Sequence, residues 1–168
     1  MDRKIYIANC ELSLAEYCPQ MDDKSYYACW QDPATQDGYN YKMCDSLDEF
    51  RGRPIRSRLL AVIIRNEDNE PLGIVSLSPE GSPPDLAIML YKPHRGKGYG
   101  TNAFALAAKY CLDTFGFVCI YAGCYETNEI SRKMLTSCGF VPYPDGDSHE
   151  KHYLTGEPIT QHDYVLHR

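Results

Sequence analysis

The sequence predicts an α/β (α+β) fold, a single domain with a mixed, mostly antiparallel sheet and flanking helices. Two apolar runs, 59–64 and 72–77, flank a polar turn and predict a β-hairpin. A third run, 86–91, ends in a glycine-rich loop, and apolar residues at helical spacing follow it over 101–115. Because the next strand, 118–124, comes after a strand–helix crossover, it should lie parallel to the strand before the helix.

Weaker patterns precede the hairpin. Alternation of apolar and polar residues over 4–8 predicts a first strand, and Ser13 is expected to cap a short helix that follows it. Asp32-Pro33 should end any helix that comes before it, because the residue before a proline avoids helical angles. Over 46–50, a serine cap predicts another short helix.

A further helix is predicted in the last third of the chain, with Thr127 or Asn128 as its cap and Gly139 at its end. Its apolar residues recur at intervals of four: Ile130, Met134 and Cys138. Three segments should follow it: a strand that starts at 140–141, a polar turn over 145–151, and a closing strand that includes 164–166.

The composition excludes several classes of function. The 168 residues carry a net charge of −6 with no basic block, so no nucleic-acid partner is expected. No apolar run approaches the roughly 20 residues of a membrane span, and residues 1–5 contain no apolar signal core. We therefore expect one domain over residues 1–168, located in the cytoplasm and without membrane contact.

Eight cysteines and one close histidine pair raise the alternatives of disulfides or a metal site. The cysteines form no C-x-x-C pair, and several lie within apolar runs, which favours reduced thiols packed in the core. His149 and His152 have no third ligand nearby in the sequence, so no metal is expected.

The loop between 86–91 and 101–115 predicts a phosphate-binding site. A helix that begins at glycines leaves its first backbone N–H groups unpaired and carries about half a positive charge at that end. A Walker loop is excluded because Lys97 is followed by Gly98 rather than by Ser or Thr, and the G-x-G-x-G spacing departs from the dinucleotide fingerprint. The pattern that remains is Arg-x-x-Gly-x-Gly, starting at Arg95, which by itself also fits a plain tight turn.

A second motif begins 28 residues after Gly100, where Asn128-x-x-Ser131 opens a helix that closes with Gly139-Phe140. This order of glycine loop, helix, strand and Asn-led helix resembles the GNAT superfamily of acyl-CoA N-acetyltransferases. The sequence is most similar to the ribosomal-protein and amino-acid N-acetyltransferase branch, in which Asn-x-x-Ser is frequent. The resemblance covers residues 86–140 well and implies a GNAT-like domain whose two parallel strands splay apart.

The resemblance implies that acetyl-CoA is the acyl donor. Its pyrophosphate would bind the glycine loop, and its pantetheine arm would pair with the backbone of the first splayed strand. The cofactor-binding residues that it implies are Met89, Leu90, Tyr91, Arg95, Gly96, Lys97, Gly98, Tyr99, Gly100, Thr101, Asn128 and Arg132.

Two departures from the family pattern bear on catalysis. Pro93 stands two residues before Arg95 rather than three, which shifts the bulge expected in the preceding strand. Leu135 occupies the position where many members carry a tyrosine that protonates the leaving thiolate, so Ser131 is the candidate acid. The other candidates, each of which also fits a turn, cap or core position, are Asp85 and Glu126 as general base and Tyr121 as a hydroxyl donor. A water chain is an alternative to a dedicated base.

The predicted reaction moves an acetyl group directly, through a ternary complex, to a primary amine: a protein N-terminus, an amino acid, a polyamine or a small amine. Because the tyrosine is missing, a non-catalytic acyl-CoA-binding regulatory domain is the alternative. Aromatic residues between positions 26 and 41 could form a wall for the acceptor or fill the core. Homodimers are common in the superfamily, and no sequence pattern decides for or against one.

Overall fold

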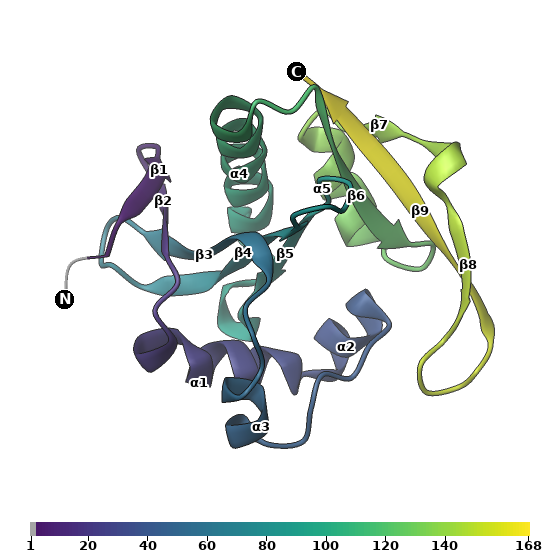
Figure 1. Cartoon of the computed structure of the whole chain (residues 1–168), viewed down its shortest axis with the longest axis horizontal. Helices are drawn as coiled ribbons and strands as arrows, with labels where there is room; N and C mark the ends of the chain where they lie inside the picture. The colour runs from purple at the N-terminus through teal and green to yellow at the C-terminus, as the bar shows by residue number, and fades with distance from the viewer. Residues whose placement is uncertain (1–2) are drawn as a thin grey trace.

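Two β-sheets that meet at one corner form the frame of the structure, a computed structural model that describes residues 3–168 (Figure 1). Residues 1–2, within the segment where we expect no signal core, lie outside the described part. The first sheet is antiparallel, and its strands are adjacent in the order of the chain. They are β1 (Ile5–Ala8), β2 (Leu12–Glu16), β3 (Ser57–Arg65), β4 (Pro71–Pro79) and β5 (Leu86–Leu90).

The second sheet is built around β9, which pairs antiparallel with each of the other strands. Its strands are β6 (Cys119–Tyr125), β7 (Val141–Pro142), β8 (Ser148–Lys151) and β9 (Pro158–His167). A parallel bridge between Asp85 and Tyr121 joins the two sheets, and Tyr121 N donates to Pro84 O over 2.8 Å. Beyond this bridge β5 and β6 separate, which confirms the splayed parallel pair but divides the expected mixed sheet in two.

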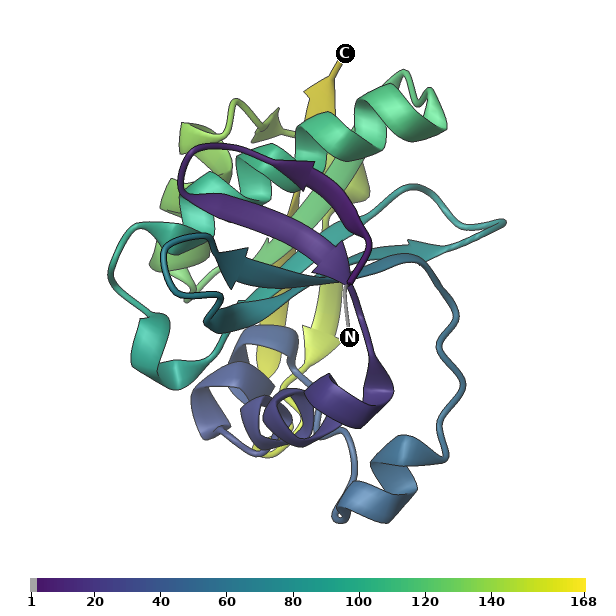
Figure 2. The same ribbon diagram turned by 90° about the vertical axis from the view of Figure 1, so that its left-hand side faces the viewer.

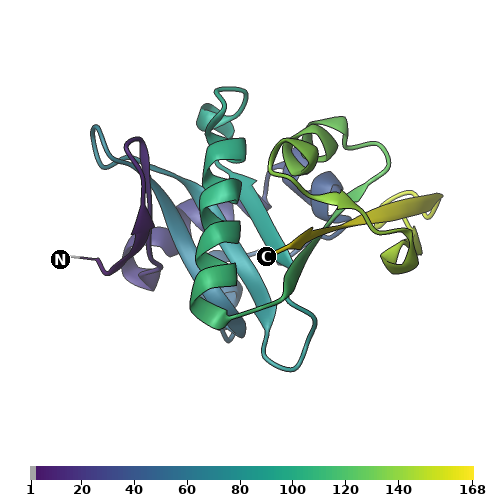
Figure 3. The same ribbon diagram turned by 90° about the horizontal axis from the view of Figure 1, so that it is seen from above.

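Helices cover both faces of the first sheet (Figures 1 and 2). On one side lie α4 (Tyr99–Phe115) and α5 (Glu129–Ser137), and on the other lie α1 (Pro19–Trp30), α2 (Pro33–Tyr39) and α3 (Leu47–Arg51). Two short 3-10 turns complete the set, η1 (Lys92–His94) and η2 (Pro144–Gly146). Figure 3 shows α4 lying over the first sheet and α5 beside β6.

This double cover explains why the hairpin strands are almost continuously apolar. A strand buried on one face alternates apolar and polar residues, whereas one buried on both faces needs apolar residues throughout. In β3, Ala61 belongs to the core under α4 that includes Phe104, and Val62 belongs to the core on the α1 side that includes Trp30. The sequence of β3 therefore serves two cores at once.

Local signals set several helix ends as predicted. α1 ends at Trp30, before Asp32-Pro33, and Pro33 opens α2. Ser46 Oγ accepts a hydrogen bond from Glu49 N over 3.2 Å, which satisfies a donor that the first turn of α3 leaves free. α4 ends at Gly116, whose φ of 68° is a left-handed conformation that glycine adopts readily.

Three local expectations are wrong. Ser13 lies in β2 and caps no helix, and its hydroxyl donates to Asn66 Oδ1 over 2.6 Å. The segment 145–151 forms the end of η2 and the strand β8 rather than one turn. The residues of β8 are mostly exposed, so the strand has no alternation of apolar and polar residues that would reveal it in the sequence. Ile130 belongs to no apolar core stripe, because its side chain is 84% exposed at the rim of a cleft.

Candidate active site

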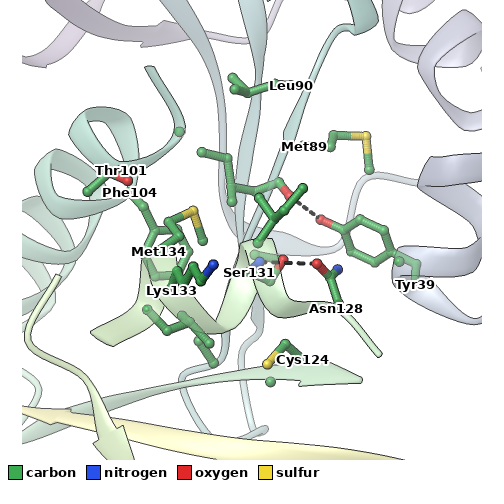
Figure 4. A pocket seen from close by; sticks show the side chains of 18 of the residues that line it. Tyr39, Met89, Leu90, Thr101, Phe104, Cys124, Asn128, Ser131, Lys133 and Met134 are labelled. Carbon is green, nitrogen blue, oxygen red and sulfur yellow. Dashed lines mark hydrogen bonds between the residues drawn. The ribbon is translucent and has the colours of Figure 1, made fainter. Parts of the chain in front are cut away.

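A cleft of about 630 Å³ lies between β5 and β6, on the side where the two strands separate. Its walls come from elements far apart in the chain: α2, β5, the loop that opens α4, β6 and α5. Figure 4 shows side chains from these walls around the cleft, among them Tyr39, Leu90, Thr101, Cys124 and Ser131. Both helical layers therefore meet the splayed strands at one place.

The hydrogen bonds of β5 determine which backbone groups face this cleft. At one end of the strand Ser78 N donates to Asp85 O, and at the other Tyr91 N donates to Leu72 O, each over 2.9 Å. Bonded and non-bonded residues alternate in an antiparallel pair. The odd-numbered residues of β5 are therefore bonded to β4, and the even-numbered residues direct their N–H and C=O groups to the opposite edge.

Ile88 and Leu90 consequently turn their backbone groups toward the cleft, and their carbonyl oxygens already have partners. Tyr39 Oη donates to Ile88 O over 2.7 Å, and Arg95 Nε donates to Leu90 O over 2.9 Å. No described side chain accepts a hydrogen bond from either N–H group. At Ile88 and Leu90 the open edge of β5 thus presents unpaired N–H donors beside carbonyl groups that are already occupied.

This geometry distinguishes among the expected backbone partners of the pantetheine arm, which stay a prediction. Leu90 fits, but the backbone groups of Met89 and Tyr91 are used in the ladder with β4. The Met89 and Tyr91 side chains belong to the core on the α1 side, with 7% and 8% exposure, and of the two only Met89 also lines the cleft. The sequence reasoning missed Ile88, which the two-residue alternation would have indicated once the register of the β4–β5 pair was known.

Glycines create the ligand space in front of α4. Gly96 and Gly98 have φ values of 73° and 86°, which other residues adopt only with strain. Gly98 is the N-cap of α4, a helix of 17 residues whose N-terminal dipole favours an anion. A Cβ built on either glycine would meet no atom within 4 Å, so the space before the helix is open.

The other loop residues divide into two groups. Gly100 and Thr101 line the cleft together with the two preceding glycines. Lys97 and Tyr99 do not line it, and the Tyr99 hydroxyl accepts a hydrogen bond from Arg65 Nη1 over 3.1 Å. The loop therefore borders the cleft through its glycines and Thr101 rather than through these two side chains.

Arg95 lines the cleft, but its guanidinium is held within the protein. It forms an ion pair with Asp32, donates to Thr35 Oγ1 over 2.9 Å, and donates to Leu90 O. The Asp32 side chain is only 13% exposed, which makes this pair stronger than a surface contact. Arg95 therefore ties the glycine loop to the junction of α1 and α2, a role that the sequence pattern alone did not indicate.

The start of α5 forms the facing wall. Asn128 Oδ1 accepts a hydrogen bond from Ser131 N over 3.1 Å and so caps the helix (Figure 4), and both residues line the cleft. Arg132 does not line it, since its guanidinium lies 3.3 Å from Glu129 Oε1 on the outer face. Lys133, which the sequence reasoning did not select, lines the cleft instead.

Of the remaining candidates, only Asp85 lines the cleft. Burial and the nearby Asp163 raise the pKa of the Asp85 carboxyl to about 6, and no described group donates a hydrogen bond to that carboxyl. Glu126 is exposed, and its Oε1 accepts a hydrogen bond from Thr160 N over 3.0 Å. Tyr121 lies at the bridge between the sheets and outside the cleft lining.

The aromatic residues between positions 26 and 41 lie mainly in the core, and one of them, Tyr39, reaches the cleft. Tyr39 lines the cleft, and its ring centroid lies 5.0 Å from that of Trp30. Tyr26 and Trp30 pack with Phe50 in the core on the α1 side. One aromatic side chain faces the ligand space, and its neighbours hold it there.

The chain matches the family model of the acetyltransferase (GNAT) domain over residues 11–141. No curated protein sequence matches it. Solved structures match at low identity, so they show the fold alone. Among residues 3–168, no helix is long and apolar enough to cross a membrane, and no three His, Cys, Asp or Glu side chains are grouped to hold a metal ion.

Three of these structures come from acetyltransferases with different names. A spermidine N-acetyltransferase from Vibrio cholerae, in complex with CoA and spermine, has a TM-score of 0.81 at 17% identity over 95% of this chain and 96% of that one. The RimL ribosomal L7/L12 alpha-N-protein acetyltransferase in complex with CoA has a TM-score of 0.79 at 15% sequence identity, and the match covers 98% of each chain. The microcin C7 self-immunity acetyltransferase MccE, in complex with acetyl-CoA and AMP, has a TM-score of 0.72 at 17% sequence identity. This match covers 95% of this chain and 94% of that one.

Proposed function

The chain belongs to the GNAT acetyltransferase family and is an acyltransferase enzyme, and we propose that it moves the acetyl group of acetyl-CoA directly to a primary amine. The acceptor class is a protein N-terminus, an amino acid, a polyamine or another small amine. The neighbouring structures come from enzymes named for a polyamine, a ribosomal protein and a microcin, so similarity to them does not select one acceptor. We infer the class of primary amines from the chemistry of acetyl transfer. Nothing supports a purely regulatory acyl-CoA-binding role.

The observation that carries the proposal is the open edge of β5. Two free N–H groups, at Ile88 and Leu90, lie along a cleft that leads to the N-terminus of α4. In the proposed complex the amide and thioester carbonyls of acetyl-CoA accept from these donors, and the pyrophosphate binds the backbone at Gly96–Thr101. Asn128 borders the arm, and Lys133, rather than Arg132, supplies positive charge to a phosphate.

The proposed transfer uses groups that line the same cleft. Asp85 accepts a proton from the ammonium, and the free amine attacks the thioester carbon. Electron density moves to the carbonyl oxygen, where the Ile88 N–H stabilises it. Collapse of this intermediate breaks the carbon–sulfur bond, and the proton that the nitrogen still carries passes through the Ser131 hydroxyl to the departing thiolate, which gives the N-acetyl amide, the free thiol of CoA and an unchanged serine. With a pKa of about 6, the Asp85 carboxyl is mostly ionised at neutral pH and is poised to act as the base.

The test follows thiol release from acetyl-CoA with a thiol reagent across a panel of amines: spermidine, α-amino acids, a short peptide with a free N-terminus, and an aminoglycoside. Release above hydrolysis with at least one class is expected. Stabilisation of the protein by acetyl-CoA without release in the presence of any amine would overturn the transfer reaction.

A glycine pair tests the proposed coenzyme loop. Gly98→Leu should abolish stabilisation by acetyl-CoA, because a side chain there enters the space proposed for the pyrophosphate. Gly81→Leu is the matched control: Gly81 has a similar φ, 83° against 86°, and a Cβ there also meets no atom within 4 Å, but it lies away from the cleft. Equal loss of acetyl-CoA binding in both variants would contradict the loop assignment.

A further inference from the structure

Tyr39 places a hydroxyl in the cleft at the edge of β5, which no part of the proposed reaction has used so far. It is the last residue of α2, and Figure 4 shows its ring entering the cleft with the hydroxyl directed at the backbone of β5. The acceptor is Ile88 O, at 2.7 Å. Burial raises the pKa of this phenol far above its usual range, so the hydroxyl remains a donor at any working pH.

The contact changes the polarity of the strand edge. An unpaired β edge normally presents N–H and C=O groups in turn. Here the carbonyls of Ile88 and Leu90 are both occupied, that of Ile88 by Tyr39 and that of Leu90 by Arg95. A free Ile88 carbonyl would place a negative dipole beside the thioester oxygen that is proposed to bind the adjacent N–H. The repulsion would grow as that oxygen gains charge, in a site where solvent screening is weak.

We propose that Tyr39 is a positioning residue for acyl transfer, which caps the Ile88 carbonyl so that the thioester oxygen meets the N–H donor of Ile88 and no free carbonyl beside it. This inference rests on the proposed function, since it assumes that acetyl-CoA lies along β5. Tyr39 acts through the backbone of Ile88 and exchanges no proton with the reacting atoms.

Contacts that do not involve the hydroxyl hold the Tyr39 side chain in place. Its ring packs on Trp30, and α2 ends at Asn40 in a left-handed conformation with a φ of 49°. Asn40 Nδ2 donates to Glu150 Oε2 over 3.1 Å and to Lys151 O over 3.0 Å. These contacts anchor the end of α2 to β8, so removal of the hydroxyl alone should leave the ring in place.

The test is Tyr39→Phe, with Tyr153→Phe as the matched control. The Tyr153 hydroxyl also bonds to α2, at Gln36 Oε1 (3.3 Å) and Asp37 Oδ1 (3.1 Å), but it lies outside the cleft. For Tyr39→Phe we expect kcat to fall about tenfold, less than the loss of a direct oxyanion donor, with the KM for acetyl-CoA within about threefold of the original. Tyr153→Phe should change both by less than about twofold.

A second measurement separates positioning from other roles. Isotope-edited infrared spectra of bound acetyl-CoA, labelled with 13C at the acetyl carbonyl, report the hydrogen bonding of that carbonyl. The stretch should lie at lower frequency in the original protein than in Tyr39→Phe, and Tyr153→Phe should leave it unchanged. A Tyr39→Phe variant with unaltered kcat, or with reduced kcat and an unshifted carbonyl band, overturns the inference.

The proposed function and this inference can fail separately. If the original protein releases no thiol with any amine, the transfer reaction is wrong, and the infrared comparison still reports whether Tyr39 sets the polarity of the edge. If the original protein transfers acetyl and Tyr39→Phe behaves as Tyr153→Phe does, the reaction stands and the role of Tyr39 is wrong.

Discussion

The two edges of β5 differ completely within one short strand. On the β4 side the backbones approach so closely that a Cβ on Gly73 would lie 2.2 Å from Met89 O. On the β6 side pairing stops after the bridge between Asp85 and Tyr121. One edge holds the first sheet together, and the other leaves backbone donors for a ligand. A strand can therefore be structural on one side and leave its other side unpaired, which is the side where we propose that the coenzyme binds.

The glycines on the two sides show the same contrast. The atoms nearest to a Cβ on Gly73 are backbone atoms of Met89 and Leu90. A Cβ on Gly123, in β6 across the cleft, would meet the side-chain ends of Gln161 and Asp163 at 2.1 and 2.9 Å. Side-chain ends can rotate away, whereas the backbone of a paired strand cannot, so the closed edge should tolerate substitution far less well.

Gly73→Ala should have the largest effect on stability. The added methyl group cannot be placed without separating β4 from β5, and we expect the free energy of unfolding to fall by about 4 kcal/mol or more. Gly123→Ala is the control and should cost about 1 kcal/mol or less. Urea denaturation of both variants measures the difference, and equal losses would show that the two edges are not distinct in this way.

Asp85→Asn should have the largest effect on the proposed reaction at the open edge. We expect kcat/KM to fall about 100-fold, within the range for a general base. In the original protein the rate should rise with pH as the Asp85 carboxyl ionises around its pKa of about 6, and the variant should lack this limb. A rate profile with the same limb in both proteins would assign the base to another group or to water.

The same substitution should make the protein more stable at neutral pH. The pKa of the Asp85 carboxyl is raised from its ordinary value of 3.8 to about 6 in the folded protein, so folding favours the protonated form. Its contribution to stability is complete below about pH 4 and is lost as the pH rises through about 6. Since one pKa unit corresponds to about 1.4 kcal/mol, Asp85→Asn should gain on the order of 3 kcal/mol at pH 7. The difference in unfolding free energy between the two proteins, measured from pH 4 to 7, should grow with pH; a constant difference would contradict the raised pKa.

The sequence predicted the frame of the fold because its signals are local. Glycines, prolines and capping residues act on their neighbours, and Gly116 and Ser46 set helix ends as expected. The open edge was not predictable in the same way. The Leu86–Leu90 segment is apolar throughout, and only its register with β4 decides that the Ile88 backbone, and not that of Met89, faces the cleft.

Contacts between segments that are distant in the chain could not be predicted from the sequence either, because they too depend on the tertiary fold. Arg95 bonds to Asp32, 63 positions away, and Tyr39 bonds to Ile88, 49 positions away. No local pattern records such a pair. Ser131 and Asp85, in contrast, were selected from the sequence by motif position and strand end, and both line the cleft.

The smallest predicted effect concerns α5, which forms the wall of the cleft opposite the open edge of β5. Two neighbouring cationic residues of this helix should differ in how much they contribute to CoA binding. Lys133 lines the cleft, whereas Arg132 is paired with Glu129 outside it. Lys133→Ala should raise the Kd of CoA about fivefold, or about 1 kcal/mol, and the loss should shrink as salt screens the phosphate. Arg132→Ala should change the Kd by less than about twofold, since an exposed ion pair contributes little. Calorimetric titration of CoA at low and high salt makes the comparison. If Arg132→Ala has the larger effect, the helix presents its opposite face to the coenzyme, and the expectation from the family resemblance is better than the one from geometry.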